Sequence, residues 1–598
     1  MDSNNPTVHA KRWLGQFSDV LQGGDSRAIA AAFTDDCYWR DLLAFTWNII
    51  TCEGRDSIGA MVSATLAATK PGGWTVDGDA TFNNGVVEAW LTFETALGRG
   101  RGHLRLRDGR CRTLLTALTE LKGFEEPRGE RRDLGTRHGA VRERETWQQR
   151  RAKEQNEIGR TQQPFCLIVG GGQGGLALGA RLRQLGVPTL IIDKHARAGD
   201  AWRKRYRSLC LHDPVWYDHM PYLPFPDHWP VFTPKDKIGD WLEMYARVME
   251  LNCWHSSECQ SAEYDDRRQE WRVVVDRAGE KVTLRPRHLV LATGMSGVPS
   301  VPRFPGAESF RGVHHHSSRH PGGEGFAGKK CVVIGSNNSA HDIAADLWEH
   351  GAEVTMVQRS PTLVVRSETL MKYAIGRLYS EAALKAGITT EKADFTVASV
   401  PYGLVTEIQI PIYQKIRQVD AGFYDKLRAA GFMLTFGEDE AGLSLMYMRR
   451  GSGYYIDVGA SQLIIDGEIR LRSGVEVQRL SERGVVLSDG SELDADLIVY
   501  ATGYGSMNGW AAQLISPEVA DRVGKCWGLG SDTAKDPGPW EGELRNMWKP
   551  TRQEALWFQG GNLAQSRFYS LFLALQIKAR LEKLPTPVYG LAEAHHRS

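Results

Sequence analysis

A glycine-rich turn between a short apolar strand and a helix constrains this chain more than any other feature of its sequence. Gly170, Gly172 and Gly175 stand in the spacing GxGxxG, after the apolar run CLIV and at the start of the helical run LALGARLRQL. The first glycine permits a tight turn, the second lets the backbone approach a pyrophosphate, and the third lets the helix pack on the strand. Asp193 ends the next strand, TLIID, where an acid hydrogen-bonds a ribose hydroxyl. These features predict a βαβ unit that binds a dinucleotide.

A second, degenerate unit of the same kind covers residues 329–360. Its turn contains four candidate binding residues, Gly335, Ser336, Asn338 and Ser339. Asn337 replaces the middle glycine, which leaves an ordinary strand-to-helix turn as an alternative. Arg359 ends the strand EVTMVQR at the position of the ribose acid, and a guanidinium there pairs with a 2′-phosphate. We therefore predict an NADPH site, with NADH as the alternative nucleotide and a solvated surface arginine as the alternative for Arg359.

Two dinucleotide sites in one chain imply electron transfer between two nucleotides, and a flavin with a nicotinamide is the common pair. The length of 598 residues allows several domains, because one hydrophobic core stops growing at roughly 250–300 residues. We predict an α/β fold with two Rossmann-like domains, for FAD and NAD(P)H, preceded by an α+β domain. The predicted boundaries are an N-terminal domain over 1–124, a charged linker over 125–162, an FAD-binding domain in two parts over 163–318 and 496–598, and an NAD(P)H-binding domain with a helical insertion over 319–495.

Composition and charge exclude several classes of protein. Lys and Arg total 73 against 72 Asp and Glu, so no net field attracts polyanions and we expect no nucleic-acid partner. No apolar run approaches the roughly 20 residues that cross a bilayer, and the N-terminus lacks an apolar signal region, so we expect no membrane span and a cytoplasmic location. The nine cysteines include no close CxxC pair, which argues against a flavin disulfide reductase, since such an enzyme needs a redox dithiol beside its flavin.

Further motifs between residues 165 and 570 resemble those of the flavin-containing monooxygenases. Phe310, Gly312 and His316 match the fingerprint FxGxxxH, and LATG and YATGY look like two ATG hinges. GDAWRKRY resembles the GGxW element, and LCLHDPVWY looks like the LHxP segment of plant and microbial members. The combination identifies the chain as a member of the class B flavoprotein monooxygenases, and its N-terminal extension resembles the microbial type II subgroup. The three histidines 314–316 do not predict a metal site, because consecutive side chains on an extended segment cannot all face one ion.

The resemblance implies the cofactors and the reaction. It assigns FAD, NADPH with NADH also accepted, O2 and a small organic substrate. One oxygen atom would reach the substrate through a C4a-(hydro)peroxyflavin, by N- or S-oxygenation or by Baeyer–Villiger oxidation of a ketone. By position it assigns FAD to Gly170, Gly172, Gly175, Asp193, Lys194 and Trp202, the nicotinamide nucleotide to Gly335, Ser336, Asn338, Ser339 and Arg359, and a further cofactor contact to Thr502 in the second ATG hinge.

Residues at three places in the sequence are candidates for the chemistry, each with an alternative. His212 stands where many animal members carry Asn near the reactive edge of the flavin, and it either donates a hydrogen bond there or packs. Arg366 stands near the position of an anion-stabilising arginine of Baeyer–Villiger relatives, with an ordinary surface arginine as the alternative. Asn562 and Gln565 follow a Gly-rich turn before a helix that closes over the flavin in this family, and a plain buried helix is the alternative. Asp200 replaces the second glycine of GGxW, so the backbone there is expected to differ.

The N-terminal domain resembles the cone-shaped fold of nuclear transport factor two and polyketide cyclases. Asp35, Asp36 and Asp41 are its candidate acid/base residues, and a solvated turn is the alternative. A structural or dimerisation role is favoured, so a homodimer through this domain is one expectation. Two other functions remain open for the whole chain. One is oxidative decarboxylation of an aryl pyruvate, as in plant relatives that share the LHxP segment, and the other is an NAD(P)H oxidase or redox-sensing flavoprotein.

Overall fold

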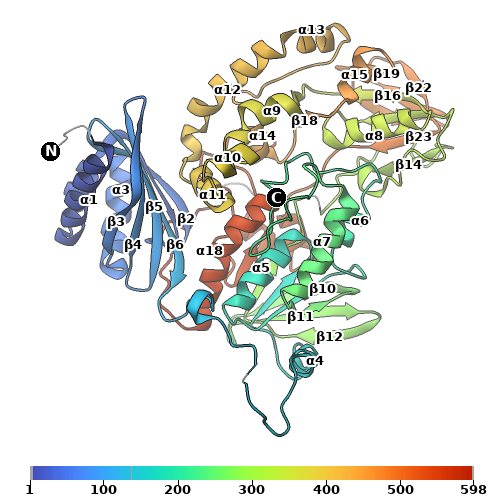
Figure 1. The fold of residues 1–598 in the computed structure, drawn as a ribbon. Helices are drawn as coiled ribbons and strands as arrows, with labels where there is room; N and C mark the ends of the chain where they lie inside the picture. Colours follow the sequence, from blue (N-terminus) through green and yellow to red (C-terminus); the bar gives the residue numbers. More distant parts are fainter. Residues whose placement is uncertain (1–4, 137, 296, 595–598) are drawn as a thin grey trace.

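The computed structural model of the protein describes residues 5–136, 138–295 and 297–594. Two parallel sheets with their helices form the larger part of the molecule, and a six-stranded sheet with three helices stands beside them (Figure 1). The structure confirms the predicted α/β class with Rossmann-like sheets. Within the described ranges, no helix has both the length and the apolar character that crossing a bilayer requires.

The first parallel sheet has the strand order β24-β13-β7-β8-β9. Its strands are β7 (Cys166–Val169), β8 (Thr189–Ile192), β9 (Cys253–Trp254), β13 (His288–Leu291) and β24 (Leu556–Phe558). Its helices include α5 (Gln173–Gln184), α7 (Lys235–Val248) and α18 (Leu563–Leu581). Every residue of β7, β8, β13 and β24 is buried, as is usual for parallel strands covered on both faces. Helix α5 packs against α18, so segments far apart in the sequence complete one layer.

The second parallel sheet has the order β14-β23-β15-β16-β19. Its strands are β14 (Val313–His316), β15 (Lys330–Ile334), β16 (Glu353–Gln358), β19 (Ile469–Ser473) and β23 (Leu497–Tyr500). Helix α8 (Asn338–Glu349) follows β15 and packs on β15 and β16, which gives the predicted βαβ unit.

A helical insertion interrupts this second unit between two short parallel strands, β17 (Leu363–Arg366) and β18 (Tyr454–Asp457). Its helices are α9 (Ser367–Tyr373), α10 (Glu381–Lys385), α11 (Thr390–Ala398), α12 (Val405–Val419), α13 (Ala421–Ala429) and α14 (Leu443–Arg450). Buried aromatic side chains, among them Tyr413, Tyr424 and Phe436, form its core. In Figure 1 the insertion arches from the second sheet to the N-terminal domain, with α11 next to α18.

Two small antiparallel sheets and four short helices complete this part of the chain. The sheets are β10 (Ser257–Asp265), β11 (Glu270–Arg277) and β12 (Glu280–Leu284), and β20 (Val477–Leu480), β21 (Gly484–Leu487) and β22 (Glu492–Asp494). The helices are α6 (Asp200–Arg203), α15 (Ala460–Ile465), α16 (Asn508–Leu514) and α17 (Pro517–Val523).

The N-terminal domain is a six-stranded sheet of order β2-β1-β6-β5-β4-β3, on which α1 and α3 pack. Its elements are α1 (Pro6–Gly23), α2 (Ser26–Ala31), β1 (Phe33–Leu42), β2 (Ile49–Glu53), α3 (Gly54–Thr69), β3 (Gly72–Asn83), β4 (Val86–Glu94), β5 (Gly98–Arg107) and β6 (Arg110–Leu121). Its core holds stacked and edge-on rings, including Trp13, Phe17, Phe33 and Trp39.

The three candidate acids of this domain are not brought together. Asp41 is fully buried and accepts hydrogen bonds from Thr116 Oγ1 at 2.6 Å and Thr46 Oγ1 at 2.7 Å. Burial raises the pKa of Asp41 to about 6 against the effect of these bonds. Asp35 and Asp36 have exposed side chains in ion pairs with arginines. Asp41 therefore holds the bend after β1, and the arrangement does not form an acid/base pair.

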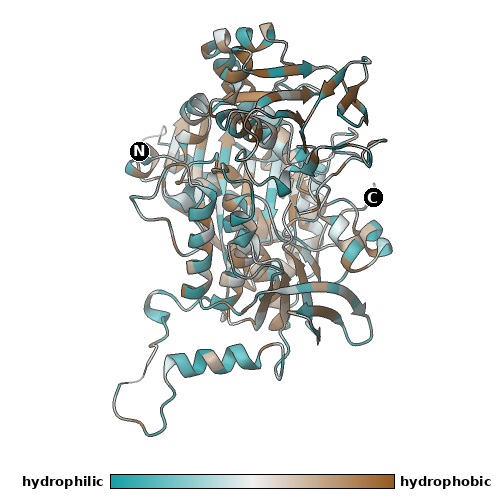
Figure 2. Ribbon diagram, turned by 90° about the vertical axis from the view of Figure 1, so that its right-hand side faces the viewer, coloured by the Kyte–Doolittle hydropathy of each residue, from teal (hydrophilic) through white to brown (hydrophobic). Residues whose placement is uncertain are grey.

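The charged segment that follows the N-terminal domain contains a helix, α4 (Trp147–Glu157), with a Thr146–Gln149 capping box. Figures 1 and 2 show that α4 and the loop before it project from the rest of the molecule, and Figure 2 shows that their residues are mostly hydrophilic. Arg151 is buried and donates to Asn252 Oδ1 at 3.1 Å. Polar side chains therefore attach α4 to the first parallel sheet, which is why the sequence shows no apolar face there.

Candidate functional site

The first Gly-rich turn combines two tight positions with one open position. At Gly170 φ is +114°, and a Cβ built there would lie 2.3 Å from the Ala292 carbonyl oxygen. A Cβ on Gly175 would lie 1.9 Å from the Gly170 carbonyl oxygen, so helix and strand need glycine here to pack. By contrast, no atom of the described residues lies within 4 Å of a Cβ built on Gly172, and none of their side chains caps α5. The first N–H groups of α5 thus adjoin open space, which suits a phosphate.

Asp193 supports this turn from the next strand. Its Oδ2 accepts a hydrogen bond from Gly171 N at 2.6 Å, and its Oδ1 accepts one from His195 N at 2.7 Å. Each carboxylate oxygen keeps a lone pair that can accept from a ribose hydroxyl. Lys194, the next residue, is exposed, and its Nζ lies 5.8 Å from the ring centre of Trp510.

Gln173 joins the turn to two distant segments, and the sequence analysis missed it. Its Oε1 accepts a hydrogen bond from Trp202 Nε1 at 3.2 Å, and its Nε2 donates to the Gly561 carbonyl at 3.3 Å. The variable position directly after the second glycine of GxGxxG was the only sequence signal for it. Through Gln173 the predicted residue Trp202 lies at the N-terminus of α5.

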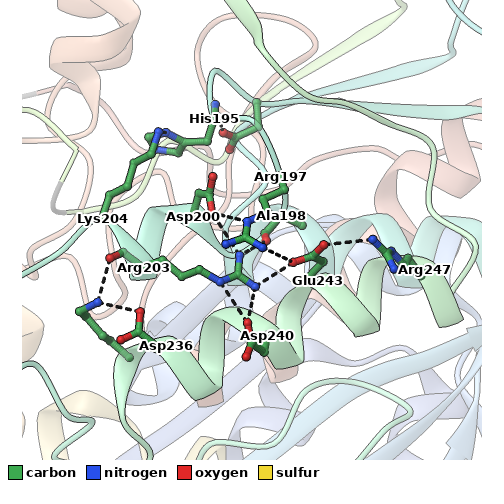
Figure 3. Close-up of polar contacts among 12 residues, drawn as sticks. His195, Arg197, Ala198, Asp200, Arg203, Lys204, Asp236, Asp240, Glu243 and Arg247 are labelled. Atoms are coloured by element: carbon green, nitrogen blue, oxygen red, sulfur yellow. Dashed lines mark hydrogen bonds and ion pairs between the residues drawn. The ribbon is translucent and has the colours of Figure 1, made fainter. Parts of the chain in front are cut away.

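The structure explains why Asp200 replaces a glycine. Gly199 has φ +85°, and a Cβ there would lie 2.1 Å from the Gly239 carbonyl oxygen, so only the first glycine of the pair is required. Asp200 begins α6, and Figure 3 shows Arg197 and Arg203 converging on it, at 3.2 Å and 3.1 Å. Burial opposes ionisation of Asp200, but the hydrogen bonds from Arg203 and Arg197 outweigh it and lower its pKa. The acid therefore anchors α6 by charge.

The second Gly-rich turn repeats the tight geometry of the first. Gly335 has φ +130°, and a Cβ there would lie 2.4 Å from the Ala501 carbonyl oxygen. The side chains of the predicted binding residues are engaged internally: Ser336 Oγ lies 2.7 Å from Thr362 Oγ1, and Asn338 Oδ1 accepts from Ile456 N at 3.0 Å. No side chain caps α8. Its backbone N–H groups, and not these side chains, are therefore available to a phosphate.

Three further predicted residues surround this turn. Ser339 lies beside the Tyr206 hydroxyl. Arg359 follows β16 with a side chain that is 65% exposed, and its Nε lies 3.9 Å from Glu476 Oε1. This loose pair leaves the guanidinium free to bind an anion. Thr502 Oγ1 donates to the Ser300 carbonyl at 2.5 Å, which ties the second ATG hinge to the chain after the first.

His212 pairs with the helix that follows the second turn. Its Nε2 lies 3.5 Å from Asp342 Oδ2 on α8, and Tyr206 OH donates to the same oxygen at 2.8 Å. Burial lowers the pKa of His212, but the hydrogen bond and charge of Asp342 outweigh it, so the pKa is raised. His212 Nδ1 is buried and has no hydrogen-bond partner among the described residues. A protonated His212 therefore has one N–H held by Asp342 and a second left to donate to a bound molecule.

Asn562 is the N-cap of α18, where it forms a capping box with Gln565. Asn562 Nδ2 donates to Tyr217 OH at 3.1 Å, and Tyr447 OH donates to Gln565 Oε1 at 3.0 Å. The segment 212–217 thus has His212 against α8 at one end and Tyr217 against α18 at the other.

Arg366 lies in a separate ion-pair group. Its Nη1 is 3.3 Å from Asp420 Oδ1, its Nη2 is 3.7 Å from Glu368 Oε2, and its guanidinium lies 5.7 Å from the ring centre of Phe423. These partners all belong to the helical insertion. The structure therefore brings His212 and Asn562 to one segment and ties Arg366 elsewhere.

A carboxylate and three tyrosines near this segment were missed by the sequence analysis. Burial raises the pKa of Asp213 to about 6, while the charge of His212 opposes it. Burial also raises the pKa of the Tyr217, Tyr447 and Tyr454 hydroxyls, and the charge of Asp213 raises them further. All four side chains are of intermediate burial. The only sequence signal was the variable position of LHxP, which Asp213 occupies.

The three consecutive histidines have three different partners. His314 Nδ1 lies 2.9 Å from Tyr500 OH, His315 Nε2 lies 3.0 Å from His320 Nδ1, and His316 Nε2 donates to the Gly503 carbonyl at 3.0 Å. His316, in the FxGxxxH fingerprint, therefore holds the second hinge.

Comparison with known proteins identifies relatives of this architecture. Residues 167–402 match a family model described as pyridine nucleotide-disulphide oxidoreductase. Indole-3-pyruvate monooxygenase YUCCA1 from Oryza sativa subsp. japonica is 31% identical over 352 residues, which cover 57% of this chain and 77% of the relative. YUCCA4 from the same plant is 32% identical over 359 residues, covering 57% and 74%. The nine cysteines of this chain are free in the structure, and no two of them stand in a close CxxC pair in the sequence.

Two solved structures show the same fold. The open crystal structure of cyclohexanone monooxygenase aligns with a TM-score of 0.50 at 18% identity, covering 70% of this chain and 88% of that one. The complex of OTEMO with FAD and NADP aligns with a TM-score of 0.50 at 17% identity, covering 71% and 85%.

Proposed function

Because this chain belongs to the flavin-containing monooxygenase family, we propose that it uses FAD and NADPH to transfer one oxygen atom of O2 to a small organic molecule. The observation that carries the proposal is that one segment, residues 200–217, contacts the first Gly-rich turn and the helix that follows the second. Trp202 reaches Gln173 at the start of α5, and His212 reaches Asp342 on α8. Two dinucleotides bound at these turns would therefore adjoin the same segment.

The residues present fit these two cofactors. The open cradle at Gly172 and the uncapped start of α5 suit the FAD pyrophosphate, and Asp193 suits its ribose. The uncapped start of α8 suits the second pyrophosphate, and Arg359 suits a 2′-phosphate, which favours NADPH. When bound, the flavin supplies hydride acceptance from the nicotinamide and activation of O2.

The chain itself would supply hydrogen bonding and exclusion of water. His212 would donate through Nδ1 between the two cofactor sites, with Asp342 stabilising its charge. Tyr217 and Tyr447, fixed by Asn562 and Gln565, would wall the substrate space and keep water from it. Substrates oxidised there would be sulfides, amines or ketones that fit among these rings.

A second candidate function is oxidative decarboxylation of an aryl pyruvate, because the relatives named above are indole-3-pyruvate monooxygenases. A pyruvate carries a carboxylate, which needs a cation or several donors. Protonated His212 offers one donor, but Arg567 is already paired with Asp394, and Asp213 adds an acid beside His212 and Tyr217. Charge thus favours neutral or cationic substrates over this alternative.

The test is product formation from labelled oxygen. The purified protein with FAD, NADPH and 18O2 would be given a sulfide, a tertiary amine, a cyclic ketone and indole-3-pyruvate in turn. We expect one 18O atom in a product of the first three classes, in proportion to NADPH consumed. Complete recovery of the NADPH electrons as hydrogen peroxide with every substrate would instead establish an NAD(P)H oxidase. Product from indole-3-pyruvate alone would establish the decarboxylase.

A further inference from the structure

The N-terminal domain lies against the helical insertion of its own chain. Four arginines of its sheet make the contacts: Arg40 on β1, Arg101 and Arg105 on β5, and Arg112 on β6. Their partners in or next to α11 and α12 are Ala398, Glu391, Ser399 and Glu407. Figure 1 shows this sheet beside α11 and α18, so part of the surface available for dimerisation is covered internally.

Arg40 is the centre of this contact. Its side chain is 2% exposed and forms a two-bond ion pair with Glu543, at 2.6 Å and 2.8 Å. The same guanidinium donates to the Ala398 carbonyl at 2.8 Å and to Tyr569 OH at 3.1 Å. One residue of the N-terminal domain therefore contacts the end of α11, the middle of α18 and the chain before β24. A buried guanidinium with this many partners fixes their relative positions, because moving any of them leaves a buried charge unpaired.

A second buried arginine continues the connection toward the candidate site. Asp394 lies one turn before Ala398 on α11 and forms a two-bond pair with Arg567 of α18, at 2.8 Å and 2.7 Å. Arg567 Nη1 also donates to the carbonyls of Tyr217 and His219, at 2.7 Å and 2.6 Å. Arg567 therefore holds the backbone of the segment whose Tyr217 hydroxyl accepts from Asn562.

The C-terminal segment closes the arrangement from the other end of α18. Asn48 Nδ2 donates to the carbonyls of Tyr589 and Gly590 at 2.9 Å and 3.0 Å, and Tyr589 N donates to the Thr46 carbonyl at 2.9 Å. The chain beyond α18 thus returns to the N-terminal domain.

We infer that the N-terminal domain is an internal clamp, and that Arg40 is a positioning residue which, through α11 and Arg567, holds the Tyr217–Asn562 contact at the substrate space. This assigns the extension a role in the candidate site of its own chain. Its effect on oxygen transfer rests on the proposed function, but its effect on the order of α18 does not.

The test compares hydrogen exchange in three full-length variants. Arg40→Lys keeps the buried charge but cannot contact Glu543, Ala398 and Tyr569 together. Asp394→Asn weakens the next connection with Arg40 intact. Arg55→Lys is the control, because Arg55 contacts Asp35 and Phe33, which both belong to the N-terminal domain. The peptides compared are residues 560–570, which include the first turn of α18, and residues 72–83, which form β3 at the far edge of the N-terminal sheet.

We expect exchange at 560–570 to accelerate about tenfold or more in Arg40→Lys and Asp394→Asn, while exchange at 72–83 stays unchanged. Exchange in Arg55→Lys should match that of the natural chain. The share of NADPH electrons released as hydrogen peroxide should rise at least about twofold in the first two variants, an effect that lost stability alone would not produce below the melting temperature. Unchanged exchange at 560–570, or equal acceleration of both peptides in Arg40→Lys, would overturn the clamp. Altered exchange with no oxygenated product from any form, the natural chain included, would support the clamp and refute the proposed function.

Discussion

His212 Nε2 lies 3.5 Å from Asp342 Oδ2, so the LHxP segment is tied by an ion pair to the helix that follows the second Gly-rich turn. The two residues are far apart in the sequence. His212 lies between α6 and α7, beside the first parallel sheet, and Asp342 lies on α8, which packs on the second.

Asp342→Asn is expected to lower the pKa of His212, because burial lowers that pKa and Asp342, more than Asp213, raises it. A raised folded-state pKa stabilises the fold below the unfolded value of about 6.5 and ceases to do so as pH rises through the folded value. The variant should therefore lose stability mainly at acidic pH. NMR titration of the His212 ring, with urea unfolding at pH 5.5 and pH 8.5, checks both parts. An unchanged His212 pKa would show that the pair does not control its protonation.

Gly172→Ala is expected to weaken FAD binding without unfolding the protein, whereas Gly175→Ala is expected to destabilise the fold. A methyl group on Gly172 meets no atom within 4 Å, so the fold should persist while FAD affinity falls about tenfold or more. A methyl group on Gly175 would lie 1.9 Å from a carbonyl oxygen and should destabilise the protein by about 1–3 kcal/mol or more. Flavin titration and thermal unfolding of the flavin-free protein separate the two. Equal loss of stability in both variants would mean that Gly172 is needed for packing and does not leave space for the FAD pyrophosphate.

Asp213→Asn is expected to stabilise the fold at neutral and alkaline pH. Burial raises the pKa of Asp213 to about 6, so ionisation of this carboxyl destabilises the folded state. The destabilisation is absent below about pH 4 and complete above about pH 6. The variant should gain about 1–3 kcal/mol at pH 8 and little at pH 4. Urea unfolding at both pH values measures this, and Asp489→Asn, at an exposed ion pair, is the control. A gain that does not depend on pH would contradict the explanation.

Arg359→Gln is expected to raise the KM for NADPH about tenfold while the KM for NADH stays unchanged, because only NADPH carries the 2′-phosphate. The side chain is 65% exposed, so stability should not change. Arg366→Gln is the comparison, since its partners Asp420 and Glu368 lie in the helical insertion. Equal changes for both nucleotides would place Arg359 outside the 2′-phosphate site.

The predicted fold class and the family resemblance are confirmed, whereas the individual site residues remain predictions. The side chains of Ser336 and Asn338 show why sequence position alone was insufficient. Both stand at the predicted turn, yet they hold Thr362 and Ile456, and the anion-binding groups there are backbone N–H groups. A motif specifies the path of the backbone more reliably than the direction of each side chain.

The sequence alone determined the two βαβ units, because glycine spacing and apolar runs act within about 30 residues and depend on local sterics. It also determined the family, because several such local motifs occur in order. Only the tertiary structure decided the pairs His212–Asp342, Asp394–Arg567 and Arg40–Glu543. Each joins segments from different parts of the chain, and a charged residue in a sequence carries no sign of its partner, since burial and pairing arise only when distant elements pack.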